Sequence, residues 1–520
     1  MIVINPQLLR LQMFVNGYSK QRRRGRRLEQ GISHLTLSLF LLSFLTSCGT
    51  FASSPTPTLP PTSTPPPAAT MTSFPSPTVP PTPIPAPTRA TYTLNTSVDY
   101  DAHTVAVDES IEYPNHTGGP LTSLVLAVVP NLWANSFALT SLSVDGVPVT
   151  NYTLNGQRLD LPLPIPLNPE KLAVLTIQYT LSLPFAEQED PNISRPRIFG
   201  YTQAQMNLAN WYPFIVPFMN GDWVLHEPWF YGEHLVYDSA DYKVNLKFAN
   251  PANAPTVASS GAPEADGDAT RYTLTAGRAF VFSMSRDFQV ATEQVGDVTV
   301  SSYYSPPSKA AGRAALTASA QAIDIYSQRF GPYPHKSLSL VMADFNDGME
   351  YSAFFYLPRD FYNLYDNTIQ NYLVFVAAHE TAHQWWFEQV ANDQALQPWL
   401  DEALATYSER IYYEGLSPDL VPWWWSYRID FYNPQGFVDI PIYDGQGFRP
   451  YTNAVYFRGA HFLEDLRVRL GDETFFAFLQ DYLHQENGKI STSADFFRIL
   501  REHTKTDFSD LMRQYFQNVY

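Results

Sequence analysis

The sequence predicts an α+β multidomain protein, in which an antiparallel, β-rich N-terminal domain precedes a mainly helical domain. Three observations support this prediction. From about residue 90 to residue 295, short segments rich in Val, Thr, Leu and Tyr alternate apolar and polar residues, which is the two-residue period of half-buried strands. After Ser301 the apolar residues recur at helical spacing. The chain of 520 residues is 45% hydrophobic and 15% aromatic, so it can bury large cores.

Residues 1–47 have the pattern of a secretory signal. They contain seven Lys or Arg and one acid, and the basic stretch QRRRGRR (21–27) precedes the apolar run ISHLTLSLFLLSFLTSC (32–48). The run is shorter than the roughly 20 residues that a membrane-spanning helix needs. Its last four residues, LTSC, are similar to a bacterial lipobox. We therefore expect a lipoprotein-type signal peptide over 1–47 and lipidation of Cys48, which would place the protein outside the cytoplasm, anchored to the bacterial cell membrane.

Cys48 is the only cysteine, so the chain cannot form an intramolecular disulfide. An unmodified buried or free thiol is the alternative for Cys48. Residues 48–89 are dominated by Pro, Thr and Ser, as in PTPTLPPTSTPPP (55–67), a composition that favours polyproline II and cannot pack a core. At about 3 Å per residue, this segment could extend on the order of 100 Å. We expect a disordered tether.

The β-rich domain is predicted over 90–295 and the helical domain over 296–520. Turn residues separate several predicted strands, among them Asp145-Gly146 and Asn155-Gly156. The stretch from Lys309 to Phe330 has high helix propensity and ends at a Gly-Pro pair, SLSLVMADF follows as a strand, and most segments after Asn371 are helical in pattern. The formal net charge of −17 makes nucleic acid an improbable partner, because phosphate binding needs clustered Lys and Arg.

The stretch VAAHETAHQWWFEQV (376–390) contains two histidines four residues apart. On a helix, His379 and His383 would lie on one face, and both imidazoles could bind one zinc ion. Glu380 would lie at the edge of that face, where it could act as a general base toward a water molecule without binding the metal. The alternative is a helix whose histidines are solvated or hydrogen-bonded within the core.

A third ligand is predicted at Glu402. It lies in the first turn of a second predicted helix, WLDEALATYSERIYYEG (399–415), and eighteen residues separate it from His383. A hairpin of the two helices would return its carboxylate to the histidine face. Two imidazoles and one carboxylate, with water as fourth ligand, form a thermolysin-like catalytic zinc set. A glutamate that only complements the helix dipole is the alternative.

These motifs resemble those of the M1 family of zinc aminopeptidases, which belong to the gluzincins. H-E-x-x-H, eighteen residues and Glu match the family pattern, and WLDEALATYSE is similar to its W-L-N-E-G-[FL]-A-[ST]-Y motif. The stretch DGMEY (347–351) resembles the G-x-M-E-N exopeptidase motif, and VYFRGAHFLEDL (455–466) resembles the Y-x-K-G segment. The resemblance covers about residues 90–520. It implies a thermolysin-like catalytic domain with one zinc ion per chain, and peptides with a free N-terminus as substrates.

The resemblance also implies roles for single residues. Glu350 would bind the α-amine of the substrate, and Tyr456 would donate a hydrogen bond to the developing oxyanion. Glutamines from the β-rich domain contribute to the amine site in the family, which points to Gln203 and Gln205 within YTQAQ (201–205). Exposed loop positions are the alternative for these two glutamines.

The sequence departs from the family pattern at several positions. Asp347 replaces a small residue, Tyr351 replaces the asparagine after Glu, and Phe387-Glu388 stand where Gly-Asn is usual. We also expect a more open cleft, because the sequence ends at Tyr520 without the long helical C-terminal domain of many members.

The predicted function is that of a zinc metallopeptidase that acts as an aminopeptidase at the extracytoplasmic membrane surface. One alternative is an endopeptidase-like metalloprotease with relaxed register. Another is a catalytically silent binding or scaffold protein that retains the fold, although the presence of Glu380 and Tyr456 argues against it. The sequence gives no indication of the oligomeric state.

Overall fold

The protein is described from a computed structural model that defines residues 89–186, 198–345 and 348–520. Pro87–Tyr520 form one compact unit. The predicted signal peptide, Cys48, nearly all of the tether, and Asp347 lie outside the described residues. Within the described ranges, none of the helices combines the length and the apolar composition that crossing a membrane requires.

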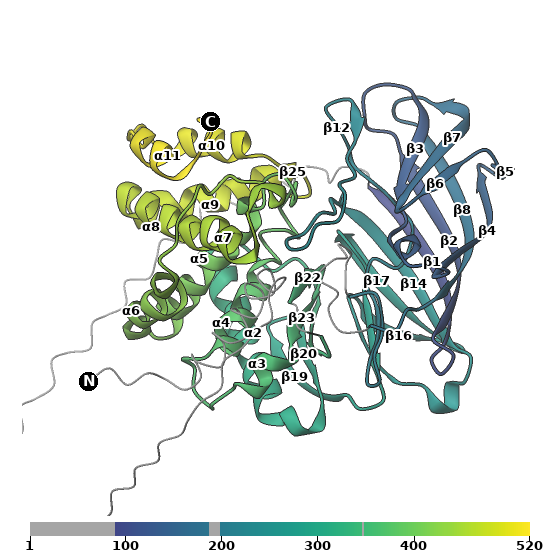
Figure 1. Cartoon of the computed structure of the whole chain (residues 1–520), viewed down its shortest axis with the longest axis horizontal. Helices are drawn as coiled ribbons and strands as arrows, with labels where there is room; N and C mark the ends of the chain where they lie inside the picture. Colours follow the sequence, from purple (N-terminus) through teal and green to yellow (C-terminus); the bar gives the residue numbers. More distant parts are fainter. Residues whose placement is uncertain (1–88, 187–197, 346–347) are drawn as a thin grey trace, which may run out of the picture. The chain divides into compact units, whose positions relative to one another are not determined.

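The N-terminal half is built on a sheet that has eight strands in the described part of the chain (Figure 1). Its strands, in spatial order, are β16 (Ala262–Asp266), β17 (Ala269–Gly277), β14 (Ala240–Phe248), β1 (Ala90–Asp99), β2 (Thr104–Pro114), β8 (Leu172–Ser182), β4 (Phe137–Val144) and β5 (Val147–Pro148). Residues along β2 and β8 alternate between buried and exposed, which confirms the predicted period. Asp145 and Gly146, with φ of 50° and 78°, form the tight turn between β4 and β5.

This sheet differs from the prediction in one pairing. Strands β1 and β14 pair in parallel, whereas the other pairs are antiparallel. The sheet is therefore mixed. A parallel neighbour needs a long crossover connection, and such a pairing between segments about 150 residues apart cannot be read from alternation within either strand.

Smaller sheets complete the β-rich half. One joins β15 (Thr256–Ser259), β18 (Phe282–Ser285), β10 (Met206–Leu208) and β9 (Gly200–Tyr201). Another joins β11 (Phe214–Ile215), β3 (Leu121–Ala127), β7 (Arg158–Leu167) and β6 (Thr153–Asn155). A short hairpin is formed by β12 (Phe218–Met219) and β13 (Asp222–Trp223).

The C-terminal half begins with a further sheet, ordered β19 (Gln289–Val295), β20 (Val298–Tyr304), β21 (Ser337–Ala343), β23 (Phe354–Pro358) and β22 (Met349–Tyr351). Because β19 pairs with β20, this sheet begins before the predicted boundary at residue 295. Helix α2 (Lys309–Arg329) packs against β19 and β20 and against α4 (Tyr372–Ala382) (Figure 1). Helix α4 in turn contacts α5 (Trp399–Leu416).

The C-terminal part is helical, as predicted. Its elements are α3 (Arg359–Asn363), α6 (Val421–Trp424), α7 (Phe448–Thr452), a π-helical segment (Asn453–Arg458), α8 (Gly459–Leu470), α9 (Asp472–Glu486), α10 (Ser493–His503) and α11 (Ser509–Tyr515), with the short pair β24 (Ala391–Asn392) and β25 (Ile490–Ser491). Two helix starts have clear local causes. Asn371 accepts a hydrogen bond from the Leu373 N–H and caps α4, and Thr492 and Asp495 form a capping box at α10.

Candidate active site

Helices α4 and α5 bring the three predicted metal ligands together. Nε2 of His379 lies 3.2 Å from Nε2 of His383 and 3.3 Å from Oε2 of Glu402, and the last pair, His383 and Glu402, is 3.7 Å apart. A tetrahedron with the bond lengths of about 2.0–2.2 Å that zinc makes to nitrogen and oxygen has edges of about 3.3–3.6 Å. All three side chains are buried. The donor set and its spacing therefore fit a zinc ion.

The electrostatics of the ligands also fit a cation. Burial, together with the neighbouring His379, lowers the pKa of His383 to about 4, so that its imidazole is neutral and has a lone pair to offer. Burial acts in the same direction on His379, but hydrogen bonds to Glu402 and Glu409 outweigh it and raise the pKa to about 10. The two carboxylates thus stabilise positive charge at this point, which a divalent metal supplies.

Glu409 is a site residue that sequence reasoning missed. Its Oε1 lies 3.0 Å from Nδ1 of His379, on the ring edge away from the metal ligands. It also accepts hydrogen bonds from Nε1 of Trp424 at 2.9 Å and from Nε of Arg428 at 3.0 Å. Carboxylates in this position fix the orientation of a ligating imidazole. The available signal was its spacing of seven residues from Glu402, which puts both carboxylates on one face of α5.

Glu380 lies next to the ligands and close to Glu350. A carboxylate oxygen of Glu350, a carboxylate oxygen of Glu380 and a ring nitrogen of His383 all lie within 4.8 Å of one another. Glu380 is buried, and a Cβ at Gly348 would come within 2.9 Å of its Oε1. The glycine therefore lets the backbone before Glu350 approach the predicted general base.

Glu350, the predicted amine ligand, lies on β22 and is buried. Its Oε1 accepts a 2.7 Å hydrogen bond from Nε2 of Gln394, which also donates to Asp401 at 3.0 Å. Burial and the negative charges of Glu402, Glu380 and Asp401 raise the pKa of Glu350 well above its ordinary value. A buried group of carboxylates such as this one is stabilised by a bound cation, and the ammonium of a peptide N-terminus is one.

Tyr456 belongs to the π-helical segment Asn453–Arg458, a type of distortion that is frequent at functional sites. Its ring is nearly parallel to that of His379, at an interplanar angle of 6° and a centroid distance of 6.1 Å. Burial and the charge of Glu402 raise the pKa of Tyr456 well above its ordinary value. The phenol is thus protonated at neutral pH and can donate a hydrogen bond.

The two glutamines that were predicted to contact the substrate amine, Gln203 and Gln205, differ in their surroundings. Gln203 is exposed. Gln205 is buried, but its Nε2 donates to Oγ of Ser283 at 2.8 Å and its Oε1 accepts from the N–H of Asp344 at 2.8 Å. Both polar atoms of Gln205 thus hold β10 and β18 to the end of β21. The glutamine that contacts Glu350 is Gln394, from the loop before α5, and the register of YTQAQ could not be fixed from sequence alone.

Known proteins resemble this chain in sequence. Residues 314–515 match the model of the Peptidase family M1 domain. Aminopeptidase M1-D of Oryza sativa subsp. japonica is 24% identical over 217 residues, which cover 39% of this chain and 25% of that protein. Aminopeptidase 2 of Candida albicans is 24% identical over 242 residues, or 43% of this chain and 26% of that protein. The chain thus spans about a quarter of the length of these curated relatives.

Solved structures resemble it over most of their length. The M1 zinc metallopeptidase from Deinococcus radiodurans matches with a TM-score of 0.59 at 18% identity, over 83% of this chain and 95% of that chain. A mutant of that enzyme bound to a Tyr-Ser-Ala substrate matches with a TM-score of 0.58 at 18% identity, over 83% and 95%. At this level of identity the likeness shows the fold. Residues 314–515, which include His379, His383 and Glu402, are thus similar to the Peptidase family M1 domain, and the chain has the fold of the M1 zinc metallopeptidase.

Proposed function

We propose that this protein is a zinc aminopeptidase, which binds one zinc ion per chain through His379, His383 and Glu402 and removes N-terminal residues from peptides. The observation that supports exopeptidase action is the position of Glu350. Its carboxylate lies within 4.8 Å of ligand-type atoms of Glu380 and His383. Such a carboxylate can bind a substrate ammonium while the first peptide bond lies at the metal site, so it selects that bond for cleavage.

The role proposed for each residue in the reaction follows from the position of its side chain. Zinc, when bound, acts as a Lewis acid and lowers the pKa of water. Glu380 takes up the proton of the attacking water and can pass it to the leaving amine, as a general base and then acid. The phenol of Tyr456 donates a hydrogen bond to the carbonyl oxygen as negative charge develops on that oxygen. Glu350, held by Gln394, keeps the α-ammonium in place.

The proposal is tested by comparing one peptide with a free N-terminus and the same peptide with an acetylated N-terminus. We expect the zinc-loaded protein to release the first residue of the free peptide and to cleave the acetylated one at least tenfold more slowly. Equal cleavage of both peptides at internal bonds would show an endopeptidase instead. No cleavage of either by zinc-loaded protein would support the catalytically silent alternative.

We further propose that the protein acts outside the cytoplasm, anchored to the membrane by a lipid on Cys48. The lipobox-like LTSC, the basic stretch before it and the Pro-rich segment after it support this location. Cell fractionation of Cys48→Ser protein tests it. We expect the variant to leave the membrane fraction, and full retention there would place the anchor elsewhere.

A further inference from the structure

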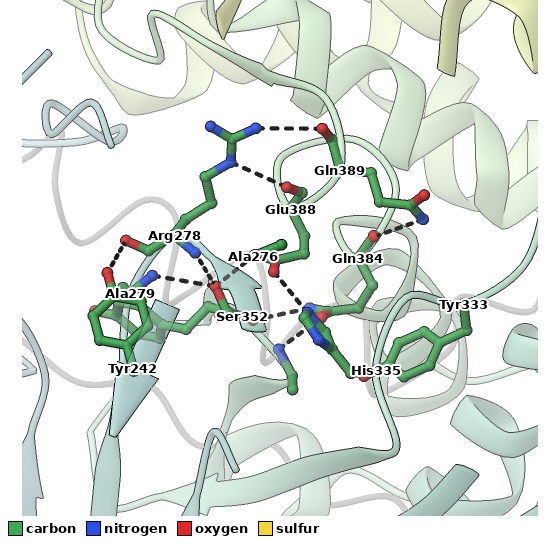
Figure 2. Close-up of polar contacts among 12 residues, drawn as sticks. Tyr242, Ala276, Arg278, Ala279, Tyr333, His335, Ser352, Gln384, Glu388 and Gln389 are labelled. Atoms are coloured by element: carbon green, nitrogen blue, oxygen red, sulfur yellow. Dashed lines mark hydrogen bonds and ion pairs between the residues drawn. The ribbon is translucent and has the colours of Figure 1, made fainter. Parts of the chain in front are cut away.

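A buried polar cluster links the segment that follows α4 to the residue that follows β22. We call it the junction cluster. It consists of Arg278, His335, Ser352 and Glu388. In Figure 2 the side chains of His335, Ser352 and Glu388 point toward one another, and the guanidinium of Arg278 points to the backbone of Glu388. The four residues are 1%, 9%, 0% and 2% exposed. None of the four belongs to the group His379, His383 and Glu402, yet the cluster includes Glu388, which stands where asparagine is usual in the family pattern.

Glu388 lies shortly after the end of α4, the helix that carries His379. The N–H of Glu388 donates to the carbonyl of His383, a metal ligand, at 2.9 Å. To make this turn, Phe387 adopts a φ of 143°, which side-chain-bearing residues rarely do. Phe387 is nevertheless buried, with its ring edge-on to Tyr237. A strained conformation at such a position persists only where the surrounding contacts hold it, and it turns the side chain of Glu388 inward.

The carboxylate of Glu388 bridges two segments. Its Oε2 accepts a 2.5 Å hydrogen bond from Oγ of Ser352, and its Oε1 lies 2.6 Å from Nε2 of His335. Ser352 is itself fixed, because its Oγ accepts from the N–H groups of Arg278 at 2.6 Å and Ala279 at 3.2 Å. These contacts, drawn in Figure 2, leave the hydroxyl one geometry in which it can donate to Glu388.

Arg278 connects the β-rich half to the same point. Its Nε donates to the carbonyl of Glu388 at 3.0 Å and its Nη2 to that of Gln389 at 3.3 Å (Figure 2). Nη2 also donates to the carbonyl of Lys489 at 3.0 Å, and Nη1 donates to that of Tyr237 at 3.1 Å. A buried guanidinium that donates to four backbone carbonyls, those of Glu388 and Gln389 among them, fixes the path of the turn after α4. The position of Glu388 is therefore set by both halves of the unit.

Ser352 follows Glu350 by two residues, so the cluster acts on the amine site. Gln384, the neighbour of His383, supports the same turn from the other side, because it donates to the carbonyl of Tyr351 at 2.9 Å and accepts from the N–H of Ala353 at 2.9 Å. The strand that carries Glu350 is thus tied at two points to the segment that carries a metal ligand. Gln384 lies two residues after the end of α4. Glu388 lies four residues further on, and its side chain is directed inward by the strained conformation of Phe387.

We propose that Glu388, acting through Ser352, is a positioning residue that fixes the separation between Glu350 and the metal ligands and thereby restricts cleavage to the first peptide bond. This inference rests on the aminopeptidase function proposed above. Glu388 touches neither metal ligand side chains nor substrate in this role. Its loss changes which peptides are cleaved, while the metal stays bound.

The test compares Glu388→Ala with Glu388→Gln. The alanine variant removes the acceptor for Ser352, whereas the glutamine variant keeps one acceptor oxygen of the same reach. Glu414→Ala is the matched control, because the carboxylate of Glu414 also accepts hydrogen bonds from a buried side chain, Arg467, at 2.7 Å and 2.8 Å, but lies near the end of α5. For each protein we would measure zinc content, Tm, and kcat/KM for free and acetylated forms of one peptide.

We expect full zinc content in all three variants. In Glu388→Ala, the ratio of kcat/KM for free over acetylated peptide should fall at least tenfold, with a raised KM for the free peptide. In Glu388→Gln and Glu414→Ala, the ratio should stay within about threefold of the wild type. If Glu388→Ala does not fold, Ser352→Ala, which removes the same hydrogen bond from the other side, is judged by the same tenfold criterion.

An unchanged ratio in a folded, zinc-loaded Glu388→Ala protein would overturn the inference. An equal fall of kcat/KM for both peptides would also overturn it, because Glu388 would then only stabilise the fold. A wild type that does not discriminate between the two peptides would instead overturn the proposed function, and this inference with it.

Discussion

The metal end and the amine end of the proposed active site are constructed in different ways. At the metal end, His379, His383 and Glu402 come from two consecutive helices that pack on each other. At the amine end, Glu350 lies on a short strand at the edge of a sheet, and its partner Gln394 comes from a loop 44 residues later in the chain. The metal end depends on spacing along helices, whereas the amine end depends on contacts among segments that are remote in sequence.

This difference predicts different tolerances. Helical spacing is robust, since ligands at i and i+4 stay on one face as long as the helix forms. A carboxylate at the end of a short edge strand has no such guarantee, and in this protein its position is maintained by hydrogen bonds from Gln384, Gln394 and the junction cluster. Changes at the metal end should therefore remove the chemistry, whereas changes at the amine end should alter selectivity.

The largest effect is expected for Glu380→Gln. The metal ligands remain, but the group that accepts the proton of water is lost, and such losses typically cost about 10²–10⁴-fold in rate. We expect full zinc content with kcat reduced by that factor, for free and acetylated peptides alike. Turnover within a few-fold of the wild type would assign the base to another residue.

Glu409→Ala tests the support of the metal end. Without the carboxylate that orients His379, zinc affinity should fall about 10–100-fold. Competition with a chelator of known affinity measures the change, and Glu414→Ala, on the same helix, provides the control. Unchanged zinc affinity would show that the packing of α4 and α5 alone orients the imidazole.

Glu350→Ala should have an effect of similar size that is restricted to one class of substrate. Hydrogen bonds to a charged group contribute about 1.5–3 kcal/mol, so kcat/KM for free peptides should fall about 10–100-fold. Acetylated peptides have no ammonium and should be affected little. A fall of equal size for both would mean that Glu350 contributes to the reaction and not to register.

The smallest effect is expected for Gln394→Ala, which removes one neutral donor from Glu350. A net loss of about 0.5–1.5 kcal/mol corresponds to a rise of about two- to tenfold in KM for free peptides.

Gln205→Ala sharpens the comparison. Because Gln205 braces Ser283 and Asp344, we expect its loss to lower Tm and leave the discrimination between free and acetylated peptides intact. The opposite result would return the amine contact to Gln205.

The sequence by itself determined the parts of this protein that depend on local periodicity. The order of a β-rich half and a helical half, the helix Lys309–Arg329, and the proximity of His379, His383 and Glu402 follow from spacing within single segments or one helical hairpin. These predictions hold because a helix or strand places neighbouring side chains on the same face whatever packs around it.

Only the tertiary structure decided which distant segments meet. It paired β1 with β14 in parallel, joined β19 to the sheet that carries Glu350, and brought Gln394 into hydrogen-bonding contact with Glu350. It also revealed Glu409 behind His379 and gave Glu388 its contact with Ser352. Such contacts depend on the register and packing of whole elements. A shift of one residue in a strand turns every side chain to the other face, and no local pattern in the sequence fixes that register.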